Sequence, residues 1–460
     1  MFSLPGTIGL IVFIYIRPQE FIESLQLVPF LYIFLALSVF GLALDLRLRV
    51  SRPTIQPMLL PSILFVMWAA ATVFLKAPDR AMPALIEFAV PVIVYIVLAQ
   101  GVQTFKGLRL IAGTLLAIAL FLAVVCVHQG FSAKGCVLLD PEGTGDLQIM
   151  QPDGRPCDNR EQCFSGSEAV PGGYYICENV GLFGTNSVAG GRVRYRGILQ
   201  DPNELALALA SVLPFAFAFF ARKKSLVRLY LMMFSMLSIS TLVIMTKSRG
   251  GILVFLAAVG IYVLKRYKGR GVVLGMVMAL PILLLGGRSG SEASQSADER
   301  FEAWKTGFEL FRSDPIFGVG FGQFLEYHYL TAHNSYILVM AEMGLLGFLL
   351  WSSLLYISTK ILVLAHFRYQ GQRPGKPATD WSLGLIAMIA STLVGITFLS
   401  MSYHLMLWIY FGLCAGFWQC VKTHDPRFTV KFGPIDAAAV FGLCSIFIVM
   451  LFGYIRLKGG

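Results

Sequence analysis

The chain has 460 residues, of which 56% are hydrophobic and only 14% are charged. In soluble proteins, charged residues make up about a quarter of the chain. The formal net charge of +11 does not indicate nucleic acid binding, because the basic residues gather in short loops between apolar runs. The composition therefore predicts an all-α polytopic membrane protein and excludes an ordinary soluble domain.

Apolar runs of about 20 residues recur along the chain, and each is long enough to cross a hydrocarbon core of about 30 Å as a helix. The runs are continuous, without the alternation of barrel strands. We predict 12 or 13 transmembrane helices, since the first run is short and could be interfacial or re-entrant. The predicted spans are 3–16, 25–44, 57–75, 81–99, 108–127, 202–220, 226–245, 250–264, 271–287, 333–363, 382–400, 404–421 and 435–455.

Two loops are long, 128–201 and 288–332, and the remaining loops are short. The short loops on one side are rich in Lys and Arg, which places them in the cytoplasm and both long loops outside it. The sequence therefore divides into N-terminal transmembrane helices, a Cys-containing outer loop, a region that holds the candidate site together with loop 288–332, and C-terminal helices. Their bounds are 1–127, 128–201, 202–363 and 364–460.

Four cysteines lie in the first long loop, namely Cys136, Cys157, Cys163 and Cys177. An even cluster in a loop rich in Gly and Pro predicts up to two disulfides, which form outside the cytoplasm. The spacing leaves their pairing open. A zinc site is the weaker alternative, because no Cys-x2-Cys pair or nearby histidine supports it.

The first polar helix start is "RVRYRGILQDPNELALALA". Asp201 as N-cap, Pro202 at the first helical position and Glu204 two residues later resemble a capping box. Asp201 and Asn203 are therefore predicted to be structural. Arg196 lies just before this helix at headgroup depth, where snorkelling to the interface is the ordinary alternative to ligand binding.

The second is "MTKSRGGILVFLAA", in which Arg249 stands at a tight turn before Gly250 and Gly251. Unshielded N–H groups at a helix start favour anions, and arginine offers a planar fork of donors that matches phosphate oxygens. A simple membrane anchor is the alternative for Arg249.

The third is "TAHNSYILVMAEMGLLGFLLW", with His333 at its mouth. Capping is the alternative for His333. Glu342 lies deep in the run, and we expect it to be a structural, buried partner of a cation or amide on a neighbouring helix. Before this run, "ERFEAWKTGFELF" predicts an amphipathic helix that lies in the interface and carries Arg300.

This set of residues is cationic and lies at the outer face: Arg196, Arg249 and Arg300, with the neutral His333. Arginines and helix N-termini suit a diphosphate, and a histidine suits a general base. We see no nucleotide-binding loop and no carboxylate cluster that would call for a divalent metal. The residues favour group transfer from a lipid diphosphate, with no metal and no cofactor.

At this point the sequence resembles the superfamily of O-antigen ligases and Wzy-type polysaccharide polymerases. The ordered motifs are "RGILQDPNELAL", "SRGG", "RFEAW" with "DPIFGVGFGQF", and "HNSYILVMAEMGLLG". Together they cover about residues 195 to 350. The Cys-containing loop looks unusual for the superfamily.

The resemblance implies a glycosyltransferase of the bacterial inner membrane with its site facing the periplasm. Its donor would be a glycan on undecaprenyl diphosphate, and its acceptor a lipid A core sugar or a growing polysaccharide. By motif, Arg249 and Arg300 would bind the diphosphate, Arg196 would be a lesser contact, and His333 would activate the acceptor hydroxyl. Besides the bilayer, other proteins of envelope polysaccharide assembly would be partners.

Two alternatives stay open at this stage. Ligase and polymerase share the donor and differ only in the acceptor, which the sequence does not reveal. A flippase or exporter of lipid-linked glycan is the alternative from another class, and it would line a path through the bundle with charged residues.

Overall fold

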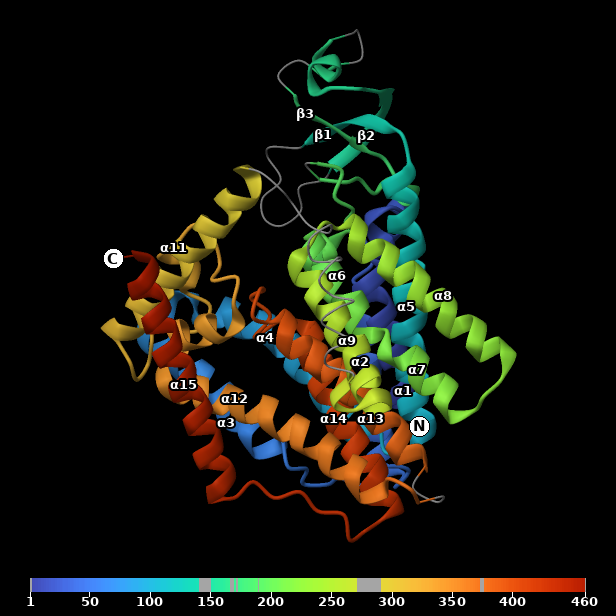
Figure 1. Ribbon diagram of the computed structural model, residues 1–460, viewed down its shortest axis with the longest axis vertical. Helices are drawn as coiled ribbons and strands as arrows, with labels where there is room; N and C mark the ends of the chain where they lie inside the picture. Colours follow the sequence, from blue (N-terminus) through green and yellow to red (C-terminus); the bar gives the residue numbers. More distant parts are fainter. Residues whose placement is uncertain are drawn as a thin grey trace. The chain divides into compact units, whose positions relative to one another are not determined.

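The computed structural model describes residues 2–139, 150–165, 169–170, 173–188, 190–270, 291–372 and 376–459 (Figure 1). Among these residues, 11 helices are long and apolar enough to cross a membrane. The predicted all-α polytopic fold is thereby confirmed. These helices are α2 (Phe30–Arg47), α3 (Leu59–Lys76), α4 (Pro78–Gly101), α5 (Phe105–Phe131), α6 with α7 (Pro202–Val212 and Pro214–Arg222), α8 (Leu226–Met245), α9 (Arg249–Tyr267), α12 (Ser335–Tyr369), α13 (Lys376–Gly395), α14 (Leu405–His424) and α15 (Pro434–Gly459).

Three of the predicted spans need comment. The first is helix α1 (Ser3–Ile16), whose 14 residues reach about 21 Å and fall short of the hydrocarbon thickness. The span predicted at 202–220 is divided into α6 and α7 by Pro214, which has no N–H to continue the helical ladder. The span predicted at 271–287 lies outside the described residues.

The chain forms two compact units that cut across the four segments expected from the sequence. Unit 1 comprises Met1–Thr7, Phe34–Ile111 and Ser289–Gly460. Unit 2 comprises Ile8–Ile33 and Ala112–Arg288. Each unit is therefore built from separate stretches of the chain, and each is described below by itself.

The core of unit 1 is the contact between α4 and α14. A Cβ added at Gly412 of α14 would lie 2.7 Å from the Leu98 Cβ of α4, and one at Gly416 would lie 3.0 Å from the Val102 Cβ. Two glycines four residues apart therefore let the two backbones approach closely, as small residues do between membrane helices. Trp408 of α14 is fully buried and meets the ring of Phe88 edge-on at 5.1 Å.

Helix α12 is broken at Gly344, in its N-terminal third, which was not predicted from the sequence. Gly344 has φ 62° and ψ −164°, a conformation essentially restricted to glycine. Around it, the Ala341 and Glu342 carbonyls accept bonds from the backbone N–H groups of Val319 and Gly320, at 3.0 and 2.9 Å. The break is therefore satisfied by the glycine-rich turn that precedes α12.

Two further bonds complete this junction. The Leu345 N–H donates to the Pro315 carbonyl at 2.8 Å. The indole N–H of Trp68, on α3, donates to the Met343 carbonyl at 2.9 Å. Irregular backbone at membrane depth is tolerated only where protein or water satisfies it, and here the protein supplies the partners.

The predicted amphipathic helix is α11 (Ser291–Ser313). Its apolar stripe packs on protein, since Phe301, Phe308 and Phe311 are buried. Phe308 meets Phe452 of α15 at 5.9 Å, and α11 runs beside the C-terminal end of α15 in Figure 1. The aromatic periodicity predicted the helix, and the structure shows that α12 and α15 pack against α11.

In unit 2, the Cys-containing loop carries a small antiparallel sheet of order β2-β1-β3. The strands are β1 (Lys134–Leu139), β2 (Met150–Pro156) and β3 (Tyr174–Asn179). β1 follows directly after α5, so the sheet extends from the end of that helix (Figure 1). These strands were not predicted from the sequence.

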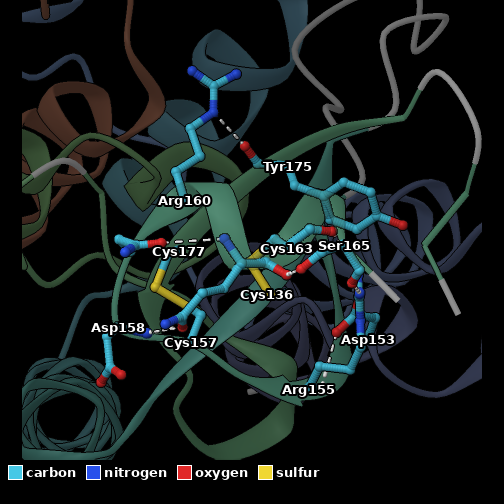
Figure 2. Close-up of a disulfide and its surroundings, with 12 residues drawn as sticks. Cys136, Asp153, Arg155, Cys157, Asp158, Arg160, Cys163, Ser165, Tyr175 and Cys177 are labelled. Carbon is cyan, nitrogen blue, oxygen red and sulfur yellow. Dashed lines mark hydrogen bonds and ion pairs between the residues drawn. A yellow bond between two sulfur atoms is a disulfide. The ribbon is translucent and has the colours of Figure 1, made fainter. Parts of the chain in front are cut away.

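The four loop cysteines form two disulfides, Cys136–Cys163 and Cys157–Cys177 (Figure 2). Cys136 and Cys177 face each other across β1 and β3, yet each bonds to a cysteine outside that strand pair. The bonds therefore attach β2 and the turn after it to the β1–β3 pair. The sulfurs of Cys136, Cys157 and Cys163 lie within 4.8 Å of one another, but as disulfide sulfurs they are not the thiolates that zinc binds.

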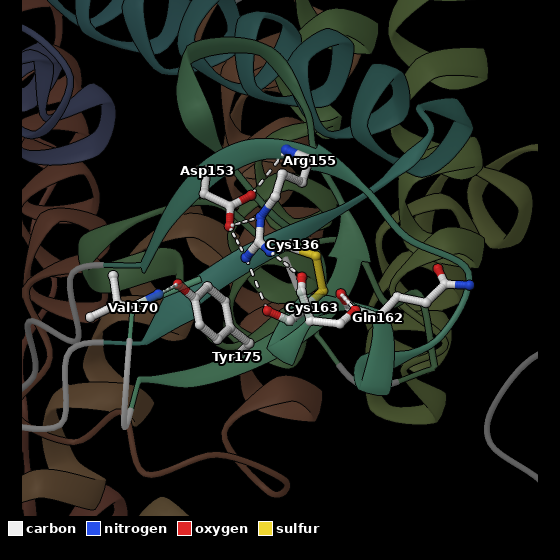
Figure 3. Close-up of polar contacts among 8 residues, drawn as sticks. Cys136, Asp153, Arg155, Gln162, Cys163, Val170 and Tyr175 are labelled. Carbon is white, nitrogen blue, oxygen red and sulfur yellow. Dashed lines mark hydrogen bonds and ion pairs between the residues drawn. A yellow bond between two sulfur atoms is a disulfide. The ribbon is translucent and has the colours of Figure 1, made fainter. Parts of the chain in front are cut away.

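Arg155 fastens the rest of this small sheet. Its guanidinium donates to the Asp153 carboxylate at 2.6 and 2.8 Å, and to the carbonyls of Cys163 and Ser165 at 3.0 Å (Figure 3). The Tyr175 hydroxyl accepts from the Val170 N–H at 2.9 Å. The sheet has a small apolar core, so the disulfides and this arginine carry much of its stability.

We expect the disulfides to be necessary for the sheet to hold together. They close separations of 27 and 20 residues, and loop-closure entropy gives each about 3–4 kcal/mol. Replacing both cysteines of either pair by serine should make residues 134–188 sensitive to limited proteolysis. Cys414→Ala, at a buried free cysteine of α14, is the matched control and should leave the cleavage rate unchanged. Equal cleavage of all variants would contradict the prediction.

The break at Gly344 should tolerate no side chain. A Cβ there would lie 2.2 Å from the Ile316 carbonyl oxygen, in a backbone conformation that other residues avoid. Gly344→Ala should lower the free energy of unfolding by about 3 kcal/mol or more. Gly260→Ala in α9, where an added Cβ meets nothing within 4 Å, should be neutral. Thermal unfolding in detergent compares the two; similar midpoints would show that the break is dispensable.

Candidate functional site

His333 immediately precedes the N-cap of α12 and is half-buried. Its φ is 45°, in the left-handed region that side chains with a Cβ seldom adopt. Holding a non-glycine residue there costs about 1–3 kcal/mol, and such strain persists only where the surroundings over-determine the backbone. Strained residues of this kind cluster at functional sites, so the conformation makes His333 a candidate for function.

The backbone after His333 is fixed by the segment between α13 and α14. Asn334 caps α12 by accepting from the Ile337 N–H at 3.1 Å, and its amide donates to the Thr397 carbonyl at 3.1 Å. Ser335 takes part in four further bonds with this segment. Its partners are the carbonyls of Ile396 and Leu399, the N–H of Met401 and the hydroxyl of Ser402, at 2.7–2.9 Å.

The backbone before His333 is fixed by α11. The indole N–H of Trp304 donates to the Ala332 carbonyl at 3.0 Å. Arg300 lies one turn earlier on the same helix, about 6 Å along its axis from Trp304. Unit 1 therefore brings Arg300 and His333, 33 residues apart in the numbering, to the same end of α12.

Glu342 is buried, with 2% of its surface exposed. The Glu342 carboxylate accepts from the backbone N–H of Phe324 at 3.0 Å, so its amide partner is a backbone group of the short 3-10 helix Phe324–Glu326 and not a side chain of a transmembrane helix. The partner lies in the turn "GVGFGQF", whose backbone also bonds to the break in α12. Glu342 therefore bonds to this turn, and a structural role for it stays a prediction.

In unit 2, Asp201 is the N-cap of α6 and Pro202 begins that helix. The Asp201 carboxylate accepts from the backbone N–H of Asn203 at 2.6 Å and from the Asn203 side-chain amide at 2.8 Å. Both residues are therefore occupied in shaping the helix start.

Arg249 is the first residue of α9, and its side chain is exposed. Ser248 caps the helix by accepting from the Gly251 N–H at 3.0 Å. A Cβ at Gly251 would lie 2.5 Å from the Ala206 Cβ, so this glycine lets α9 pack closely on α6. The helix start thus presents an arginine beside backbone N–H groups, an arrangement that attracts anions.

The Arg196 guanidinium is held by two backbone carbonyls, those of Glu20 and Phe183, each at 2.6 Å. Burial lowers the pKa of Arg196, opposed by the negative charge of Glu20. Arg196 therefore braces the loop before α6, and a part for it in diphosphate binding stays a prediction.

Sequence reasoning missed the structural importance of Arg192 and Arg194. Arg192 is buried and donates through Nε to the Thr246 carbonyl at 3.0 Å, which joins this segment to the turn before α9. Arg194 donates to the Asn186 carbonyl at 3.1 Å, and burial lowers its pKa to about 10, opposed by Glu178 and Asp201. The alternation in "RVRYR" was the available signal, since every second residue of an extended segment faces one way.

The described residues thus offer two separate arrangements. In unit 1, a strained, braced histidine stands at the mouth of α12 with an arginine on the adjoining helix. In unit 2, an exposed arginine stands at the start of α9. A histidine can accept a proton from a hydroxyl, and arginines at helix starts can hold phosphate oxygens.

A family model described as O-Antigen ligase matches residues 233–352. The match runs from α8 into α12 and includes Arg249, Arg300, His333 and Glu342, whereas Arg196 lies before it. A comparison with curated proteins found no match. The chain is therefore a polytopic membrane protein with one region, residues 233–352, that is similar to the O-antigen ligase family; this stretch is called the family region below.

Proposed function

We propose that the protein transfers a glycan from undecaprenyl diphosphate to a hydroxyl group of an acceptor sugar, at the periplasmic face of the bacterial inner membrane. The observation that carries this proposal is the left-handed backbone of His333, φ 45°, inside the family region. The surrounding protein maintains that strain from both sides, as it would for a side chain whose direction matters.

In the proposed reaction, the imidazole of His333 takes the proton of the acceptor hydroxyl while that oxygen attacks the anomeric carbon of the donor. The bond between this carbon and the diphosphate oxygen breaks, and undecaprenyl diphosphate leaves with the electron pair. Attack opposite the leaving group inverts the anomeric centre. His333 must be neutral to act, which suits histidine near neutral pH.

Arg300 is the proposed diphosphate contact in unit 1, because its helix is fastened beside His333 by Trp304. Arg249 is proposed as a diphosphate contact on its own evidence, namely its exposure at a capped helix start. Guanidinium groups would neutralise the charge that grows on the leaving diphosphate. No nucleotide or metal is required by these steps.

Two features support the periplasmic assignment. The basic short loops favour long loops outside the cytoplasm, and disulfides such as the two of unit 2 form in oxidising compartments. The acceptor stays open between a lipid A core sugar, which would make the protein a ligase, and a growing polysaccharide, which would make it a polymerase.

The direct test incubates the purified protein with a lipid-diphosphate glycan and each candidate acceptor, without ATP or added metal, and identifies the product by mass spectrometry. A covalent glycan–acceptor product supports the proposal, and its acceptor distinguishes ligase from polymerase. Movement of intact donor across proteoliposomes, without any product, would instead support a flippase.

His333→Ala should lower the transfer rate by a factor of about 10³, within the range that general bases contribute. Donor binding and protein level should stay near normal, because the base acts on the acceptor. His328→Ala is the matched control, since this half-buried histidine in the same loop bonds through Nδ1 to its own local backbone at Leu330. Wild-type transfer by His333→Ala would remove the general-base role.

Arg300→Ala should weaken donor binding by about tenfold or more, because a charge-assisted bond to phosphate is lost. Arg300→Lys should recover only part of the affinity, since lysine lacks the planar fork. The same pair of substitutions tests Arg249. Arg312→Ala, an exposed arginine at the other end of α11, is the control. Unchanged donor affinity, measured by titration of the lipid diphosphate, would refute each role.

A further inference from the structure

Trp304 is joined to the candidate base through one hydrogen bond. Its indole N–H donates to the Ala332 carbonyl at 3.0 Å, and Ala332 is the residue before His333. Ala332 itself is fully buried. The peptide group on the N-terminal side of His333 is thus held by a side chain from a helix that begins 42 residues earlier in the numbering.

This bond restrains the backbone on the N-terminal side of His333, whereas the start of α12 restrains it on the C-terminal side. On the C-terminal side, Asn334 and Ser335 fix the chain to the segment after α13. A left-handed residue fixed on one side only can relax by rotating φ back to an ordinary negative value. With the Ala332 carbonyl fastened as well, both peptide planes that flank His333 are restrained, and its Cα–Cβ bond keeps one direction.

The Trp304 ring also has a packing role that can be separated from the bond. It meets the ring of Tyr454, on α15, with centroids 5.9 Å apart. Indole has a single donor, and here that donor is used on Ala332. A ring of similar shape without the N–H would therefore keep the contact with Tyr454 and lose only the restraint on His333.

We infer that Trp304 is a positioning residue: it directs His333 toward the acceptor hydroxyl and fixes the position of His333 relative to Arg300. Arg300 lies one turn from Trp304 on α11. The inference rests on the proposed function. It gives α11 two tasks, since one rigid helix carries a donor contact and also restrains the base. A base displaced by about 1 Å loses on the order of 10²-fold in rate, so a single restraint of this kind has a large effect on turnover.

The test is Trp304→Phe, assayed with saturating donor and acceptor. We expect kcat to fall about tenfold, while KM for both substrates changes less than about twofold, because the base acts in the transition state and not in binding. In the His333→Ala background the same substitution should have no further effect, since the group that it positions is absent. A merely structural tryptophan would lower activity by a similar factor in both backgrounds.

Two further variants separate loss of this hydrogen bond from a general effect of replacing a tryptophan and from failure to fold. Trp418→Phe makes the same exchange on α14, where the buried indole N–H has no hydrogen-bond partner among the described residues, and should leave kcat within about twofold of wild type. If Trp304→Phe does not fold, 3-benzothienylalanine at position 304 replaces the N–H by sulfur and preserves the shape of the ring.

Failure of the inference and failure of the proposed function give different results. Wild-type kcat in Trp304→Phe, with His333→Ala inactive, overturns the positioning role and leaves the base in place. Equal losses in the two backgrounds overturn it as well. If His333→Ala transfers at the wild-type rate, the proposed function itself is lost, whatever Trp304 does.

Discussion

The constraint on which the structure depends is that backbone N–H and C=O groups at membrane depth need partners within the protein. Helix α12 meets this constraint where it breaks at Gly344. The carbonyls of Ala341, Glu342 and Met343 are taken by Val319, Gly320 and Trp68. Because an unpaired group in hydrocarbon costs several kcal/mol, the break and the turn "GVGFG" can exist only together. Glu342 adds a side-chain bond to the same turn.

This junction gives the mouth of α12 a rigid base. The turn before α12 is fastened at the break, and the chain then passes through Ala332, His333 and Asn334 to begin the helix. Bonds from α11 on one side and from the segment after α13 on the other keep His333 in its unfavourable conformation. Several hydrogen bonds hold the backbone on either side of this one histidine. Their combined stabilising free energy exceeds the free-energy cost of the strained conformation.

Features that depend on a short window of sequence were predictable. Hydropathy located the helices, and the four residues from Asp201 to Glu204 indicated a capped helix start. The break in α12 was not predictable, because a glycine in an apolar run is equally typical of close helix packing. Its cause is a partner segment about 20 residues away in the numbering. The bond from Trp304 to Ala332 was likewise not predictable, because the two residues are 28 positions apart.

Within the candidate site, the residue types indicated the chemistry but not how buried each side chain is in the folded protein. Arg196 and Arg249 look alike in the sequence as arginines beside helix starts. The structure separates them by burial: the Arg196 side chain is half-buried, with two carbonyls on its guanidinium, and the Arg249 side chain is exposed. The sequence could not make that distinction, because the two carbonyls belong to Glu20, 176 residues away, and to Phe183, 13 residues away in a loop whose path a short window does not reveal.

The packing of α11 on α15 has a consequence for biosynthesis. Lys458 of α15 pairs with Asp298 of α11 at 3.1 Å and lies 4.5 Å from the centre of the Phe301 ring, and these two oppositely charged residues are 160 positions apart. While the ribosome is still making the intervening helices, the aromatic stripe of α11 has no α15 to cover it. The part of this stripe that α15 covers therefore stays uncovered until the C-terminal helix has been made.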